Sequence, residues 1–165
     1  MIAGSNSGNV TYCTARQCTL MFTYGSGGGI VGYNTGRVTN NSVMSSYITG
    51  YWLYGGGTYS YPSGHTANIG GVVGHNYTGS ILSNSVTSDT YVQYGGVGRV
   101  EDWNLAPAMG YHVGYNQGGT VSGNTGTGTV ETYGYLYTLI KYFLGFIETD
   151  RHNQAQYVGG SIGRS

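Results

Sequence analysis

The acidic and histidine side chains are the residues that could support catalysis or bind a metal ion, and they are few and scattered. The chain of 165 residues holds six acids and four histidines. Glu101 and Asp102 are adjacent, so on a strand they would point to opposite faces and could not line one cleft. The densest charged cluster, 148–152, is interpreted as a polar loop after an apolar run. The histidines lack metal-binding spacing. We therefore predict no catalytic residues, no metal site and no cofactor.

The two cysteines are separated by four residues, and their spacing suits a short loop between two strands. Cys13 and Cys18 could close such a loop as a disulfide, which is typical of extracellular proteins. The alternative is two free thiols. Two sulfur atoms supply only half of a structural zinc site. We predict a Cys13–Cys18 disulfide.

Tyrosine is the chemically most informative residue type, with 18 copies. A planar ring with a polar tip suits stacking on sugars and contact with proteins. The alternative is that many of the rings stack in ladders between repeated units and bind nothing. The predicted aromatic contact surface consists of Tyr33, Tyr51, Trp52, Tyr54, Tyr91, Tyr94 and Tyr115.

Composition excludes several classes of function. Net charge is zero and the six cationic residues are scattered, so no basic patch is present to bind nucleic acid. The most apolar run, 133–147, is shorter than the roughly 18 residues of a membrane span and is interrupted by Gly134, Lys141 and Gly145. The first residues lack the basic and apolar regions of a signal peptide. We expect no nucleic-acid partner and no membrane span.

The chain repeats itself, and this pattern predicts the elements that position the residues above. The segment at 28–34 returns at 70–76 and 110–116, and a shortened copy closes the chain at 159–165. The downstream halves of the copies match as well. Copies recur about every 40 residues, a period typical of repeat architectures.

Each copy reads as short strands joined by tight turns. β-Branched residues and tyrosines alternate with glycine and asparagine, which punctuate strands. We predict turn residues with positive φ at Gly32, Asn34, Gly74, Asn76, Gly114 and Asn116. A repeat of about 40 residues could form two solenoid coils of about 20 each. Residues 133–147 fit either a strand in register with other tyrosine-rich segments or an amphipathic helix.

The segment that begins Gly-Gly-Ile-Val-Gly-Tyr-Asn at position 28 resembles the GLUG repeat, a glycine-rich motif of bacterial surface and secreted proteins. The copies at 28–43, 70–86 and 110–125 carry the resemblance, and partial copies lie at 4–10 and 159–165. Tyrosine content and longer inserts set this chain apart. The resemblance implies a β-rich, solenoid-like stalk or adhesive region.

These observations predict an all-β fold, a parallel β-helix-like β-solenoid in a single repeat domain over 1–165. Its parts are a partial repeat at 1–27, repeats at 28–69, 70–109 and 110–158, and a partial repeat at 159–165. The expected function is structural or adhesive, in an extracellular or cell-surface setting. Expected partners are further copies stacked end to end or the rest of a longer surface protein. A carbohydrate-binding module that uses exposed tyrosines is the alternative, and a polysaccharide-processing enzyme a weaker one.

Overall fold

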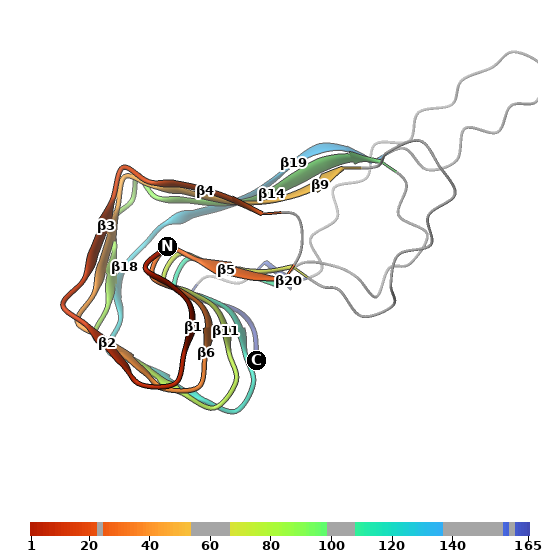
Figure 1. Ribbon diagram of the computed structural model, residues 1–165. Helices are drawn as coiled ribbons and strands as arrows, with labels where there is room; N and C mark the ends of the chain where they lie inside the picture. Colours follow the sequence, from red (N-terminus) through yellow and green to blue (C-terminus); the bar gives the residue numbers. More distant parts are fainter. Residues whose placement is uncertain (23–24, 54–66, 99–107, 137–156, 159–160) are drawn as a thin grey trace, which may run out of the picture.

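The computed structural model describes residues 1–22, 25–53, 67–98, 108–136, 157–158 and 161–165 (Figure 1). Every regular element in these ranges is a β-strand. The strands of the first coil are β1 (Ala3–Asn6), β2 (Asn9–Thr11), β3 (Thr14–Arg16) and β4 (Thr19–Phe22). Those of the second coil are β5 (Ser26–Gly28), β6 (Val31–Asn34), β7 (Arg37–Thr39), β8 (Ser42–Met44) and β9 (Tyr47–Leu53).

The third coil contains β10 (Asn68–Gly70), β11 (Val73–Asn76), β12 (Ser80–Leu82), β13 (Ser85–Val86) and β14 (Tyr91–Gly98). The fourth contains β15 (Ala108–Gly110), β16 (Val113–Asn116), β17 (Thr120–Ser122), β18 (Thr125–Gly126) and β19 (Thr129–Leu136). Strands β20 (Tyr157–Val158) and β21 (Ile162–Arg164) begin a further turn.

Equivalent strands of successive coils pair in parallel and form five sheets. Sheet A has the order β1-β6-β11-β16-β21, and sheets B to E each hold four strands. Sheet B is β2-β7-β12-β17, sheet C is β3-β8-β13-β18, sheet D is β4-β9-β14-β19 and sheet E is β5-β10-β15-β20. In each full coil the chain passes through sheets E, A, B, C and D in turn (Figure 1). The fold is therefore a β-solenoid, as predicted.

One sequence repeat forms one coil, so the expectation of two shorter coils per repeat is wrong. Asn68 pairs with Ser26 on one side and with Ala108 on the other. The strands have only two to four residues in sheets A, B, C and E, because tight corners interrupt the chain so often. The rest of each repeat lies in the longer strands of sheet D and in the connection from sheet D to sheet E.

The length of the coil varies most in that connection, and the strands of sheet D also range from four to eight residues. Residues 23–25 join the two sheets in the first coil, and residues 54–67, 99–107 and 137–156 join them in the following coils. The strands on either side keep their register in spite of these differences. The first four residues of the predicted strand or helix at 133–147 belong to β19, and its remainder lies outside the described residues.

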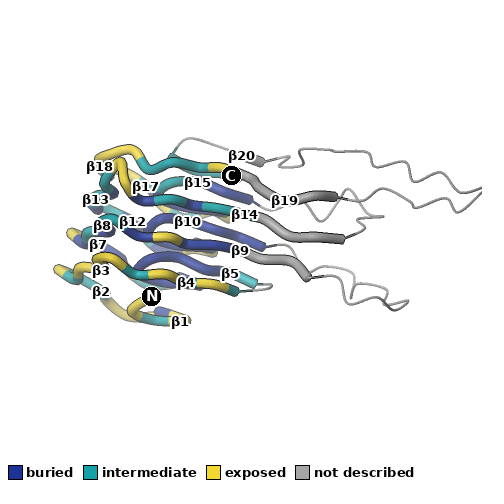
Figure 2. The backbone as a smooth tube through the Cα atoms, turned by 90° about the horizontal axis from the view of Figure 1, so that it is seen from above, coloured by how far each residue is buried: buried dark blue, intermediate teal, exposed yellow. Residues whose placement is uncertain are grey.

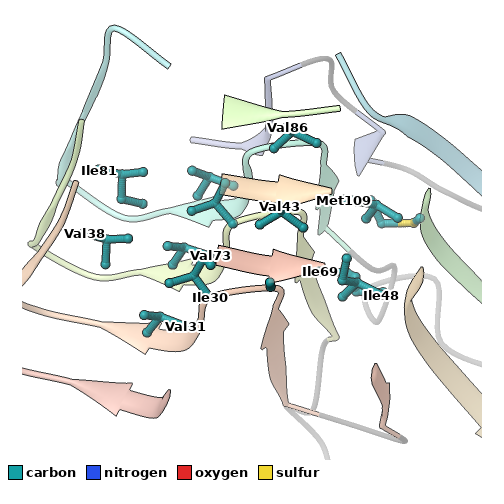
Figure 3. Close-up of a cluster of buried hydrophobic side chains, with 14 of the residues drawn as sticks. Ile30, Val31, Val38, Val43, Ile48, Ile69, Val73, Ile81, Val86 and Met109 are labelled. Atoms are coloured by element: carbon teal, nitrogen blue, oxygen red, sulfur yellow. The ribbon is translucent and has the colours of Figure 1, made fainter. Parts of the chain in front are cut away.

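Aliphatic side chains stack in columns that run along the solenoid and form its core (Figure 3). Val31 pairs with Val73, which pairs with Val113, and all three are fully buried. Similar columns come from the other sheets. Their buried members include Val38, Ile81, Val43, Val86, Ile48, Val92, Ile69 and Met109. Most members of each column are aliphatic side chains that recur at the coil spacing and fill the narrow interior.

Sheets A and E approach each other so closely that only glycine fits between them. A Cβ atom on Gly74 would lie 2.6 Å from the backbone nitrogen of Gly27 and 2.8 Å from the carbonyl oxygen of Asn68. Gly32 and Gly114 occupy the same place in the neighbouring coils and meet backbone atoms in the same way. These predicted turn residues therefore lie inside strands, where glycine is needed for close packing.

The residues with positive φ lie elsewhere. Gln17 and Ser45 lie at the corner between sheets C and D, and four others form the corner between sheets B and C. Tyr12, Asn40, Ser83 and Gly123 occupy this corner in successive coils, with φ values of 56°, 54°, 55° and 64°. Only asparagine and glycine adopt this left-handed region readily. The six residues predicted to have positive φ do not have it.

Candidate functional site

An aromatic column runs along the outside of sheet A and is the most distinctive surface feature in the described part of the chain. Tyr33, His75 and Tyr115 are paired in register on β6, β11 and β16. The rings of Tyr33 and His75 are T-shaped with centroids 5.1 Å apart, and those of His75 and Tyr115 are stacked at 4.8 Å. All three side chains are half-buried.

Tyr77 lies beside this column, directly after β11, and joins two coils. Its ring is stacked against Tyr33 with a centroid distance of 6.3 Å and lies 6.4 Å from His75. The side chain is 42% exposed. We call Tyr33, His75, Tyr77 and Tyr115 the aromatic stripe.

The imidazole of His75 carries an unsatisfied polar atom. Nε2 is buried and has no hydrogen-bond partner among the described residues. Burial lowers the pKa of His75, while a hydrogen bond with the Gln117 side chain opposes that shift. A bond that favours the protonated ring is one in which Gln117 accepts an N–H. In the neutral ring Nε2 donates or accepts according to the tautomer.

A second aromatic stack lies on sheet D. The rings of Tyr47 and Tyr91 are parallel, with centroids 5.0 Å apart and an interplanar angle of 5°. Tyr47 is 45% exposed. The sequence predicted Tyr91 as a contact residue and missed Tyr47, although both precede the same strand pattern in their repeats.

The rest of the predicted aromatic surface divides into three outcomes. Tyr94 is partly buried and packs against the hydrophobic core, and burial raises the pKa of its hydroxyl. Tyr51 and Trp52 lie in β9, of which the structure describes the backbone at these positions. Tyr54 lies outside the described residues.

Three of the predicted turn residues belong to a buried asparagine ladder. Asn6 Nδ2 donates to Asn34 Oδ1, Asn34 to Asn76 and Asn76 to Asn116, each at 2.8 Å. The same amides also shape the following turn, since the N–H of Gly36 donates to Asn34 Oδ1. These asparagines are the last residues of β6, β11 and β16 and lack the predicted positive φ. Their side chains act inside the coil and bond to the turn that follows.

A second ladder was not predicted. Asn41 Nδ2 donates to Asn84 Oδ1, and Asn84 Nδ2 donates to Asn124 Oδ1, both at 2.9 Å. Each amide also donates to a backbone carbonyl of the preceding coil. The signal was present, because asparagine recurs at this place in three repeats. Cys13 stands at the equivalent place in the first coil, where its backbone N–H donates to Asn41 Oδ1.

The predicted disulfide is wrong for this structure, in which Cys13 and Cys18 are free thiols. The two residues flank β3, which is extended rather than a loop. An extended chain advances about 3.3 Å per residue, whereas a disulfide needs Cα atoms within about 7 Å. Each thiol instead donates to a carbonyl two residues earlier, at Thr11 and Arg16 respectively.

His112 is the one buried histidine in the described ranges and takes the place of an aliphatic residue. It follows Ile30 and Val72 in a core column. Its Nε2 lies 2.9 Å from the carbonyl oxygen of Thr125, so this nitrogen carries the proton and donates. Its Nδ1 lies 2.9 Å from Ser161 Oγ, which donates to it. Burial lowers the pKa of His112.

The described acids have structural partners. Asp89 accepts from the hydroxyls of Ser45 and Thr87, and these bonds lower its pKa. Glu131 accepts from the side chain of Gln93. Glu101, Asp102 and 148–152 lie outside the described residues. Within the part that is described, no three acidic, histidine or cysteine side chains gather closely enough to hold a metal ion.

Comparison with known proteins adds no identification. No family model, curated protein or solved structure matches this chain. The strands, ladders and stripe therefore carry the functional argument. Among the described residues there is no helix of the length and apolar character needed to cross a membrane.

Proposed function

We propose that this chain is a structural and adhesive β-solenoid of an extracellular or cell-surface assembly. The supporting observation is that the described residues form the same structural features in successive coils along one axis. Parallel sheets, aliphatic columns and two asparagine ladders all continue from coil to coil without a change of register. Such a coil is a template for the next one, which suits a rod that grows by adding coils.

The two ends of the stack expose matching columns. The column of sheet B begins with Val10 in the first coil and ends with Val121 in the fourth. The column of sheet D begins with Leu20 and ends with Val130 in the same two coils. All four side chains are partly exposed, whereas their counterparts in the middle are fully buried. In Figure 2 the buried residues of the backbone trace lie mainly in the middle coils. Stacking one end on the other would bury both sets and pair the edge strands. The partner is therefore a further copy or the rest of a longer surface protein.

Sheet D gives a sharp test of end-to-end stacking. Met21, Thr49, Gln93 and Glu131 occupy one column in register. A second copy that continues this sheet places its Met21 next to Glu131. Met21 is 63% exposed, so substitution leaves the single chain folded. Met21→Glu then sets two carboxylates against each other, and Met21→Lys creates an attractive pair.

The experiment is negative-stain electron microscopy of the three proteins over a concentration series at low salt. We expect fibres with a regular axial repeat, formed at lower concentration by Met21→Lys and at higher concentration by Met21→Glu than by the unchanged chain. Thr78→Lys, an exposed change in the third coil, is the control for added charge. Discrete particles from all variants at every concentration would refute self-stacking.

A further inference from the structure

We infer that the aromatic stripe on sheet A is a binding site for a neutral oligosaccharide that lies along the solenoid axis. This inference rests on the adhesive part of the proposed function. The stripe consists of Tyr33, His75, Tyr77 and Tyr115, contributed by three successive coils. Its rings follow each other at the spacing of the coils, so an extended chain ligand meets similar groups at each step.

The chemistry of the stripe matches the two kinds of surface on a sugar. A sugar ring has an apolar face of C–H groups, which pack on aromatic rings, and a rim of hydroxyls. Tyr77 is the most exposed ring of the stripe at 42% and provides apolar area on the surface. The ring centroids of Tyr33 and Tyr77 are 6.3 Å apart at an angle of 24°, so these rings are close to parallel.

The unsatisfied nitrogen of His75 favours a ligand with hydroxyl groups, which can both donate and accept a hydrogen bond. Nε2 is buried without a partner, and Gln117 already holds the imidazole. A buried ring nitrogen without a hydrogen-bond partner lowers stability. A ligand O–H, acting directly or through one water molecule, would satisfy Nε2 once the imidazole or a covering side chain moves, because this atom is buried. A purely apolar partner would not.

Charge favours a neutral ligand. The four side chains of the stripe carry no formal charge when His75 is neutral, and burial lowers the pKa of its imidazole. The chain as a whole has zero net charge. An anionic polysaccharide would therefore find no counter-charge among these four side chains. The cation next in register is Arg164, which pairs with Tyr115 at the end of the column.

The second stack supplies a matched control. Tyr47 is 45% exposed and stacks on Tyr91, as Tyr77 stacks on Tyr33. No histidine contacts the described Tyr47–Tyr91 pair, and no unsatisfied nitrogen lies beside it. Tyr47→Ala thus removes the same side chain at nearly the same exposure, without touching the proposed site.

The experiment measures binding of cellohexaose, chitohexaose, maltohexaose and mannohexaose to the unchanged chain by titration calorimetry. We expect at least one of these probes to bind, with about tenfold loss of affinity in Tyr77→Ala and none in Tyr47→Ala. NMR spectra of the imidazole protons should show that the bound probe shifts His75 and leaves His112 unchanged.

Absence of binding by all four probes at millimolar concentration would overturn the inference. An equal loss in Tyr77→Ala and Tyr47→Ala would also overturn it, because the stripe would then have no special role. Circular dichroism of each variant establishes that it folds, and Gln117→Ala tests the site without removing a ring. Fibre formation is scored in sugar-free samples, so failure of stacking and failure of sugar binding are separate results.

Discussion

Each amide inside an asparagine ladder makes hydrogen bonds to both neighbouring coils, so a single substitution affects three coils. Asn76 accepts from Asn34, donates to Asn116 and donates to the carbonyl oxygen of Gly79, and it is fully buried. Asn76→Ala removes the acceptor of Asn34 Nδ2, which keeps its bond to the carbonyl oxygen of Gly36, and the donor to the partly buried Asn116 Oδ1. We expect a loss of about 3 kcal/mol in the free energy of unfolding, measured by urea denaturation.

The control for this substitution is Thr78→Ala, two residues away and exposed. It should change the free energy of unfolding by less than about 0.5 kcal/mol. Equal effects of the two substitutions would contradict the role of the ladder.

His112 makes stability depend on pH. Its pKa is lowered by burial from the ordinary value of 6.5, so the unfolded chain binds a proton at a higher pH than the folded chain. Stability is therefore full above pH 6.5 and falls as the pH decreases towards the folded pKa. His112→Val restores the aliphatic column, and the difference in unfolding free energy between about pH 7.5 and about pH 5 should shrink. A pH dependence that is unchanged in His112→Val would disprove this assignment.

At the residue scale the sequence identified positions better than roles. Asn34 and Asn76 were singled out because they recur, but recurrence does not distinguish a turn residue from a ladder residue. Tyr94 looked like Tyr91 in the sequence, and only strand register shows that one points inward and the other outward. Cys13 and Cys18 have a loop-like spacing, yet the residues between them form an extended strand.

At the scale of the elements, glycines at equivalent places in sheet A differ in how much space surrounds them. Gly74 lies against the backbone of sheet E, whereas nothing lies within 4 Å of the equivalent place on Gly4. The reason is that sheet E begins with β5, so β1 has no strand beside it there. Gly74→Ala should cost about 3 kcal/mol by overpacking, while Gly4→Ala should be close to neutral.

Thermal unfolding of the two alanine variants checks this prediction, because both substitutions are chemically identical and both lie in sheet A. Similar melting temperatures would show that sheets A and E do not pack as closely as described. The sequence predicted short strands and glycine punctuation correctly. It could not show that five strands make one coil, because the contact between sheets A and E joins backbones and leaves no side-chain pattern.

At the scale of the whole molecule, the sheets differ in their number of strands. Sheet A has five strands and the other sheets have four. When a second copy continues sheets B, C and D, its β1 and the β21 of the first copy compete for one place beside β16. Removing 162–165 should therefore lower the concentration at which fibres form, as judged by sedimentation.

Removal of β1 should also lower the concentration at which fibres form. Removal of both β1 and β21 should raise it again, because the place beside β16 is then empty. An equal fibre-forming concentration for all these truncated proteins would argue against the stacking geometry. The repeat period predicted the solenoid as a whole, since similar segments recur in order. The unequal strand count was not predictable, because it depends on which sheet each end of the chain enters.

Because of the connection from sheet D to sheet E, coils can differ in their number of residues and still keep the same spacing along the solenoid axis. Ladder partners are 28 residues apart between the first two coils and 42 or 40 residues apart in the next two, yet their amides meet at the same 2.8 Å. Insertions and deletions in this connection therefore leave the register of every sheet unchanged. Segments of different length can thus join the two sheets at this point, and a protein engineer can insert foreign peptides there without shifting the pairing of the strands.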